Sequence, residues 1–187
     1  MQSGLRDKPM QPESVVAFWF EAGESRWFTK DDAFDADLRT RFEIAHQTAA
    51  RGELAEWEET PAGALALVLL LDQIPRNIFR GSAHAFATDS PAREVAVRAI
   101  ASGFDLRVEQ AQRCFFYLPF EHSENADDQA HSVTLFEVLG HAEYLKFARL
   151  HRDIVRRFGR FPHRNAVLGR TSTAAELAFL QSGGFSG

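Results

Sequence analysis

The segment TPAGALALVLLLDQ, residues 60–73, decides the fold class of this chain. It opens with Thr60, whose hydroxyl can accept hydrogen bonds from the first N–H groups of a helix, and with Pro61 at the first helical position, where no N–H is needed. The run that follows is rich in alanine and leucine and holds a single β-branched residue, Val68. This composition favours a helix over a strand. The segment therefore predicts a buried helix.

The same start and stop signals recur along the rest of the chain. The helix expected from about Val108 should end near Leu118, because Pro119 disfavours helical geometry in the residue before it. Glycines after apolar stretches predict further helix ends at Gly103, Gly140 and Gly159. Capping residues and prolines predict helix starts at Pro12, at Asp31 or Asp32, at Ser90 with Pro91, at Asp127 and at Thr173.

Strand signals are nearly absent, so the predicted fold is all-α, with about seven to nine helices packed as antiparallel hairpins. A single helical domain is expected over residues 11–182, with flexible tails at residues 1–10 and 183–187. The length of 187 residues fits one domain, which can bury about 70% of the surface of its unfolded chain. No repeat of about 34 residues is visible, so the hairpins lack the sequence signature of a tetratricopeptide array.

The amino-acid composition and the net charge narrow the classes of function that the protein can have. The chain has 17 Phe but only 2 Tyr, which predicts a phenylalanine-filled interior, and its net charge of -5 argues against nonspecific nucleic-acid binding. The only cysteine, Cys114, excludes an intrachain disulfide and predicts a buried apolar side chain. With no signal-type or membrane-spanning apolar run, we expect a cytoplasmic protein without a membrane partner. The aromatic segment AFWF (residues 17–20) is expected to cover the core, and a homodimer patch is the alternative.

The clearest chemical signal is FGRFPHRNAVLGR, residues 158–170, which gathers cationic side chains on a segment broken by glycine and proline. Guanidinium groups match carboxylate and phosphate anions with paired donors. The alternative is that these arginines pair with carboxylates of the protein itself. The candidate anion ligands are Arg160, His163, Arg164, Asn165 and Arg170.

Two other segments run from apolar residues through a proline into polar groups: LLLDQIPRNIFRG (residues 69–81) and CFFYLPFEHSEN (residues 114–125). Asp72 should be buried and paired with Arg76 or Arg80, which are further candidate anion ligands, because an unpaired buried charge is costly. The second segment is expected to form a loop after Pro119. Its candidates for proton transfer are Glu121, His122 and Glu124, which could instead form an internal ion network with the arginines.

The sequence does not support a metal site or a nucleotide site. The best metal-binding trio, His122, Glu124 and His131, has poor spacing, and no HExxH, Walker or GxGxxG motif is present. We expect no cofactor and no metal.

Four strings resemble a bacterial domain-of-unknown-function family, the one numbered nine-two-four, in the same order and over roughly residues 11–182. The resemblance implies a tetratricopeptide-like α-helical superhelix and implies no activity. The strings are AFWF, LLLDQIPRNIFRG with the following AFATD, FFYLPFEHSE, and HRDIVRRFGRFPHRNAVLGRTST.

Three functions remain open at this point. The first is binding of an anionic small molecule or a peptide carboxylate in a cleft lined by the arginines. The second is an acid–base hydrolase or transferase in which His122 or Glu121 moves the proton. The third is a protein-interaction scaffold whose charges form a purely structural network.

Overall fold

The computed structural model describes residues 10–185, and within that range every regular element is helical and no strand occurs. The all-α prediction is confirmed. The predicted tails fall largely on residues 1–9 and 186–187, which lie outside the described residues. The elements are α1 (Pro12–Ala22), α2 (Glu24–Trp27), α3 (Asp32–Ala50), η1 (Ala55–Glu59), α4 (Pro61–Val68), η2 (Leu69–Gln73), α5 (Ile74–Ile78), η3 (Ala83–Phe86), α6 (Asp89–Ala101), η4 (Asp105–Arg107), α7 (Gln110–Glu121), α8 (Ala126–Leu139), α9 (Ala142–Phe158), η5 (Pro162–Arg164) and α10 (Ala174–Gln181).

Three helices, α3, α4 and α10, begin at capping residues that the sequence indicated. The Asp31 carboxylate accepts hydrogen bonds from the backbone N–H groups of Ala33 and Phe34. The Thr60 hydroxyl accepts from Gly63 N–H at 3.1 Å, and Thr173 forms a reciprocal capping box with Glu176. These caps satisfy N–H groups that have no partner inside their own helix.

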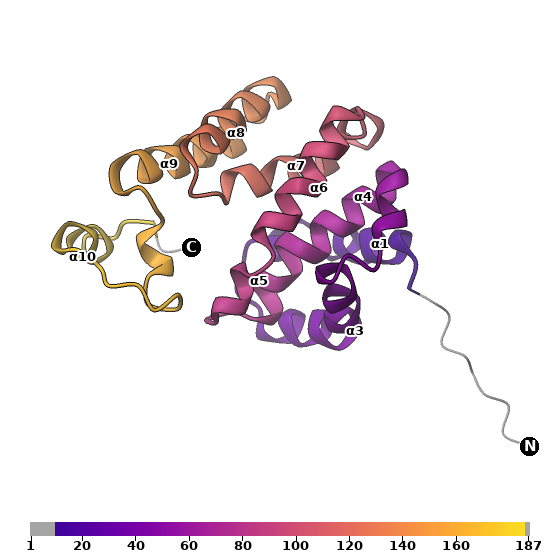
Figure 1. Ribbon diagram of the computed structural model, residues 1–187, viewed down its shortest axis with the longest axis horizontal. Coiled ribbons are helices and arrows are strands. Elements are labelled where there is room, and N and C mark those ends of the chain that lie inside the picture. The colour runs from indigo at the N-terminus through magenta and orange to yellow at the C-terminus, as the bar shows by residue number, and fades with distance from the viewer. Residues whose placement is uncertain (1–9, 186–187) are drawn as a thin grey trace, which may run out of the picture.

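One continuous core joins α1, α3, α4, α6, α7 and α8, and it is rich in aromatic side chains as predicted. The rings of Trp19 and Trp27 both meet Phe115 edge to face, with centroids 5.9 and 5.0 Å apart. In Figure 1 the chain passes from α1 and α4 at one end of the long axis to α9 and α10 at the other. A tetratricopeptide-like stacking of the helix pairs stays a prediction.

Pro75 does not interrupt the helical backbone, since the chain stays helical from α4 through η2 into α5. The turn η2 is π-helical, and the Ile74 N–H donates to the Leu69 carbonyl five residues earlier. Pro75 has no N–H for the Leu71 carbonyl four residues before it. That carbonyl accepts instead from the Thr88 hydroxyl, which lies before α6.

Three helix boundaries differ from the prediction, and one of them is the start of α8, which lies at Ala126 and not at Asp127. Helix α7 does not end at Leu118 but continues through Pro119 to Glu121, and the His122 N–H donates to the Leu118 carbonyl at 2.9 Å. The residues after Pro119 are therefore held at a helix end and not in a loop. Helix α6 starts at Asp89, one residue before the expected Ser90.

A smaller apolar cluster lies between α9 and the C-terminal segment, a name used below for residues 159–185. Ile154, Val155 and Phe161 are its buried members. Three partly buried rings pack against them, those of Phe158, Phe179 and Phe185. Within residues 10–185 no helix is both long and apolar enough to cross a membrane.

Candidate functional site

Asp72 is positioned by the π-helical turn η2, and its side chain is fully buried. The Arg76 guanidinium, one turn further along, lies 3.1 Å from the Asp72 carboxylate and also donates to the Asp72 backbone carbonyl at 2.6 Å. The Gln73 amide donates to the same carboxylate. Single π-helical turns within α-helices occur frequently at functional sites.

His122 reaches Asp72 from the end of α7. Its Nδ1 lies 2.8 and 3.0 Å from the two Asp72 carboxylate oxygens. An ionised carboxylate only accepts hydrogen bonds, so Nδ1 carries the proton and donates it. The end of α7 is itself fixed, because the buried Gln129 amide donates to the backbone carbonyls of Glu121 and Ser123 at 2.6 and 2.7 Å.

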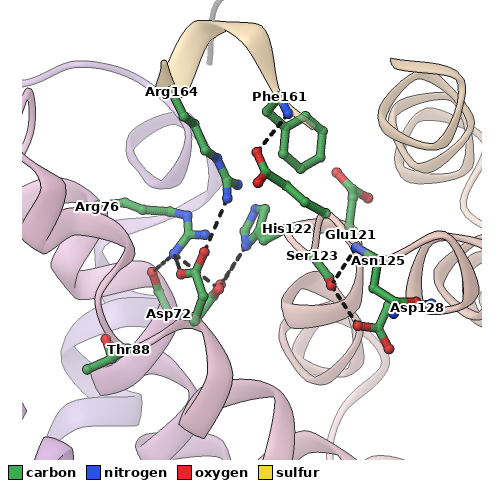
Figure 2. Close-up of polar contacts among 12 residues, drawn as sticks. Asp72, Arg76, Thr88, Glu121, His122, Ser123, Asn125, Asp128, Phe161 and Arg164 are labelled. Carbon is green, nitrogen blue, oxygen red and sulfur yellow. Dashed lines mark hydrogen bonds and ion pairs between the residues drawn. The ribbon is translucent and has the colours of Figure 1, made fainter. Parts of the chain in front are cut away.

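Asp89, in the first turn of α6, bridges two arginines. Its Oδ1 lies 3.0 Å from Nη1 of Arg76, and its Oδ2 lies 3.3 Å from Nη1 of Arg164. Figure 2 shows the side chains of Asp72, Arg76, His122 and Arg164 converging from η2, α5, α7 and η5. Residues far apart in the sequence therefore share one polar centre.

Arg164 is the most buried arginine of this centre, with 6% of its surface exposed. Its guanidinium lies between the rings of Phe86 and Phe161, 4.6 and 4.5 Å from their centroids. Its Nε is buried and has no hydrogen-bond partner among the described residues. Burial, reinforced by the nearby Arg76 charge, lowers the pKa of Arg164 to about 10. The side chain remains cationic at neutral pH and holds an unused donor.

A hollow of about 330 Å³ opens beside this centre. It lies between the start of α6, the end of α7 and the C-terminal segment. Its lining combines apolar side chains with charged groups of both signs and two hydroxyls. The lining residues are Ala83, Phe86, Ala87, Asp89, Ser90, Arg93, His122, Ser123, Glu124, Arg164 and Leu168.

The buried charges shift the pKa of both members of the Asp72–His122 pair downward. Burial alone would raise the pKa of the Asp72 carboxyl, but the Arg76 and His122 charges hold it below its usual range. Burial and the Arg76 charge lower the pKa of His122. At neutral pH the pair is therefore an ionised carboxylate that orients a neutral imidazole.

Glu121 does not join this pair, although it precedes His122 in the chain. Its carboxyl is 4% exposed and lies 3.2 Å from Nδ1 of His151 on α9. Burial, followed by the Asp72 charge, raises the pKa of Glu121 to about 8, and burial lowers the pKa of His151 to about 3. Both groups are therefore uncharged at neutral pH, and Glu121 does not line the hollow.

Glu124 does face the basic segment, as the sequence suggested. Its carboxylate accepts two hydrogen bonds from Arg170, at 2.7 and 2.9 Å, and one from the Phe161 N–H at 2.7 Å. Burial alone would raise the pKa of Glu124, but these donors lower it. Glu124 thus attaches the C-terminal segment to the end of α7.

The remaining predicted anion ligands lie elsewhere. Arg160 is bound to Glu176 at 2.6 Å, and the Asn165 amide donates to the Ser172 hydroxyl, both within the C-terminal segment. The His163 ring packs against Phe185, with centroids 5.3 Å apart, and burial lowers its pKa to about 4.

Arg80 lies at a second hollow, between α3 and α5, and not at the polar centre around Asp72. Its guanidinium pairs with Asp35 at 2.8 Å, and the Asn77 amide donates to the same carboxylate. The second hollow measures about 500 Å³. The Asp72–Arg80 pairing that the sequence left open is therefore not formed.

Comparison with known proteins assigns the chain to a family. Residues 15–184 match the model of a family described as bacterial protein of unknown function, DUF924. The chain belongs to the DUF924 family. A solved structure of a protein of unknown function from Agrobacterium tumefaciens, ATU0120, is similar to it, with 49% identity and a TM-score of 0.89 over 91% of this chain and 97% of that chain. No curated protein matches.

In this DUF924 protein, sequence reasoning missed Asp89, Phe86 and Arg93 as neighbours of the polar centre. The available signal was AFATD (residues 85–89), which sets an aromatic ring and a carboxylate directly before a helix that starts with small polar residues. No group of three or more His, Cys, Asp or Glu side chains in the described range is arranged to hold a metal ion.

Proposed function

We propose that this DUF924 protein binds a small anion, a carboxylate or phosphate group, in the hollow, with Arg164 as its principal ligand. The observation that carries this proposal is a buried guanidinium that lines the hollow, keeps its positive charge and has an unpartnered Nε–H. A buried donor without a partner costs about 1–3 kcal/mol, more on a charged group. An anion in the hollow would remove that cost.

The surroundings of Arg164 support an anionic ligand. The amino end of α6, at Asp89 and Ser90, forms one wall, and the partial positive charge of a helix start favours anions. The two lining carboxylates are already neutralised, Asp89 by Arg76 and Arg164 and Glu124 by Arg170. The volume of about 330 Å³ is at the lower end of the usual range for small-molecule sites.

The test is calorimetric titration of the purified protein with inorganic phosphate, succinate and N-acetyl-glycyl-glycine, the last as a peptide carboxylate. We expect at least one of the three to bind, and Arg164→Met to weaken that binding at least tenfold, because a charged hydrogen bond contributes about 1.5–3 kcal/mol. A ligand at 100 times its Kd should also stabilise the fold by about 2.7 kcal/mol.

The matched control is Arg149→Ala, which removes one positive charge from the exposed Arg149–Glu137 pair on α9 and α8. It should leave affinity unchanged. If Arg164→Met does not fold, Arg164→Lys retains the charge but loses the planar donor pair, and the same loss of affinity is expected. Absence of binding by all three anions would contradict the proposal and favour a protein-interaction scaffold.

A further inference from the structure

We propose that the hollow is also a catalytic site, in which His122 acts as the general base for hydrolysis of a carboxylic ester that carries a separate anionic group. The inference rests on the proposed anion site, because Arg164 would hold the anionic group of the substrate. The reacting atoms are assigned to the wall of the hollow at the end of α7, where His122 lies.

The geometry of the Asp72–His122 pair carries this inference. Asp72 is fully buried, and its carboxylate fixes the imidazole through Nδ1, while 14% of the His122 side chain is exposed and lines the hollow. Nε2 is on the other edge of the ring and has no hydrogen-bond partner among residues 10–185. A carboxylate that holds Nδ1–H leaves Nε2 as an oriented proton acceptor. Asp72 is a positioning residue, and His122 is the catalytic residue.

The groups around His122 keep the imidazole neutral and ready to accept a proton. The facing anions are Asp72 from η2 and Asp89 from α6, and the facing cation is Arg76 from α5. His151 on α9 lies with its ring centroid 6.5 Å from that of His122, and Arg164 reaches the hollow from η5. Burial of the His122 ring and the Arg76 charge lower the pKa of His122 and outweigh the Asp72 and Asp89 charges, which favour the protonated ring.

An ester fits the charge of the hollow better than a dianionic phosphate monoester. One lining guanidinium, Arg164, is assigned to the anionic group, and the other, Arg93, is paired with Asp128, so a second negative charge on the reacting group would meet no unpaired cation in the lining. An uncharged acyl carbon needs no such partner. The negative charge that develops on the acyl oxygen would face the amino end of α6, whose partial positive charge stabilises an oxyanion.

The step balances with water as the only co-reactant. A water O–H bond breaks, its proton moves to Nε2 of His122, and the water oxygen bonds to the acyl carbon. The tetrahedral intermediate then collapses, the bond between the acyl carbon and the alcohol oxygen breaks, and Nε2 returns the proton to the leaving alkoxide. The products are a carboxylic acid and an alcohol.

The experiment uses the full chain and two reporter esters, mono-p-nitrophenyl succinate and the uncharged p-nitrophenyl acetate. We expect release of p-nitrophenol from the succinate ester, with kcat/KM at least tenfold higher than for the acetate. His122→Gln should lower kcat by about 100-fold or more, the usual range for loss of a general base. His131→Gln, which changes an exposed histidine on α8, is the matched control and should retain full activity.

The pH profile separates a catalytic role from a structural one. In the wild type, kcat/KM should rise with pH through the ionisation of His122 and then level off, and Asp72→Asn should lower kcat and displace this rise. Hydrolysis unchanged in His122→Gln, or no hydrolysis of either ester above the buffer rate, would overturn the catalytic inference. Calorimetric binding of phosphate, succinate or N-acetyl-glycyl-glycine in that case would leave the anion site standing, whereas absence of binding by all three would remove both.

Discussion

The main core and the C-terminal segment are stabilised by different forces. The core that joins α1, α3, α4, α6, α7 and α8 is a continuous mass of apolar side chains, with Trp19 and Phe115 fully enclosed. The C-terminal segment buries few apolar side chains and is attached to the helices largely by charges, through Arg164 to Asp89 and Arg170 to Glu124. The segment that forms one wall of the hollow therefore depends on the same kind of interaction that an anionic ligand would make.

The largest expected loss of stability comes from a substitution in the core. Phe115→Ala should lower the free energy of unfolding by about 3–5 kcal/mol, because Phe115 is fully buried among aromatic rings and its removal leaves a cavity. Phe179→Ala, which removes a partly buried ring of the C-terminal segment, should cost clearly less. Urea unfolding of the two variants measures the difference, and equal losses would show that the two regions are not stabilised differently.

The second prediction concerns pH and the buried Glu121. Its pKa in the folded protein is raised from 4.5 to about 8, so its stabilising contribution is present at low pH and is lost as pH rises between these values. The lowered pKa values of His122, His151 and His163 have the opposite sign and remove stability as pH falls below about 6.5. Stability should therefore be greatest near pH 6–7.

Glu121→Gln should remove the alkaline decline, an effect of about 2 kcal/mol between the stability maximum near pH 6.5 and pH 8, and leave the acid decline in place. Urea midpoints between pH 5 and pH 9 provide the measurement. Parallel curves for the wild type and the variant would mean that Glu121 is ionised at neutral pH in the folded protein.

The smallest effect is expected at the attachment of the C-terminal segment. Glu124→Gln removes the charge that binds Arg170 and weakens the acceptor for the Phe161 N–H, which should cost about 1 kcal/mol because both partners are part exposed. Hydrogen exchange should accelerate in residues 159–170 and stay unchanged in α4 and α7.

The control for this variant is Glu137→Gln, which breaks only the exposed pair with Arg149. It should leave hydrogen exchange unchanged both in residues 159–170 and in α4 and α7. Faster exchange throughout α4 and α7 in Glu124→Gln would contradict a separate role for the C-terminal segment.

The sequence predicted local structure better than it predicted the site. Caps such as Asp31, Thr60 and Thr173 are read directly from neighbouring residues, because the groups they satisfy lie within one turn. The continuation of the helix through Pro75 has a tertiary cause. Thr88, seventeen residues from Leu71, supplies the hydrogen bond that Pro75 cannot make, and no local pattern reveals it.

The candidate site was also only partly predictable from the sequence. The sequence indicated that Asp72 would be buried and paired with an arginine, and Arg76 fulfils this at i,i+4. It did not indicate that His122, fifty residues away, would occupy the other side of the same carboxylate. The cations of residues 158–170 are also divided among Glu176, Asp89 and Glu124, since each arginine takes the carboxylate that the fold places beside it.

The most direct test of the proposed anion site is to record the NMR signal of the Arg164 side chain during titration with phosphate, with succinate and with N-acetyl-glycyl-glycine. The ¹H–¹⁵N signal of its Nε–H, assigned by its absence in Arg164→Lys, should shift and saturate with at least one of these anions, because the buried donor acquires an acceptor. The Nε–H signal of Arg149 should stay in place. An Arg164 signal that stays in place with phosphate, with succinate and with N-acetyl-glycyl-glycine would contradict the claim that the hollow is an anion site.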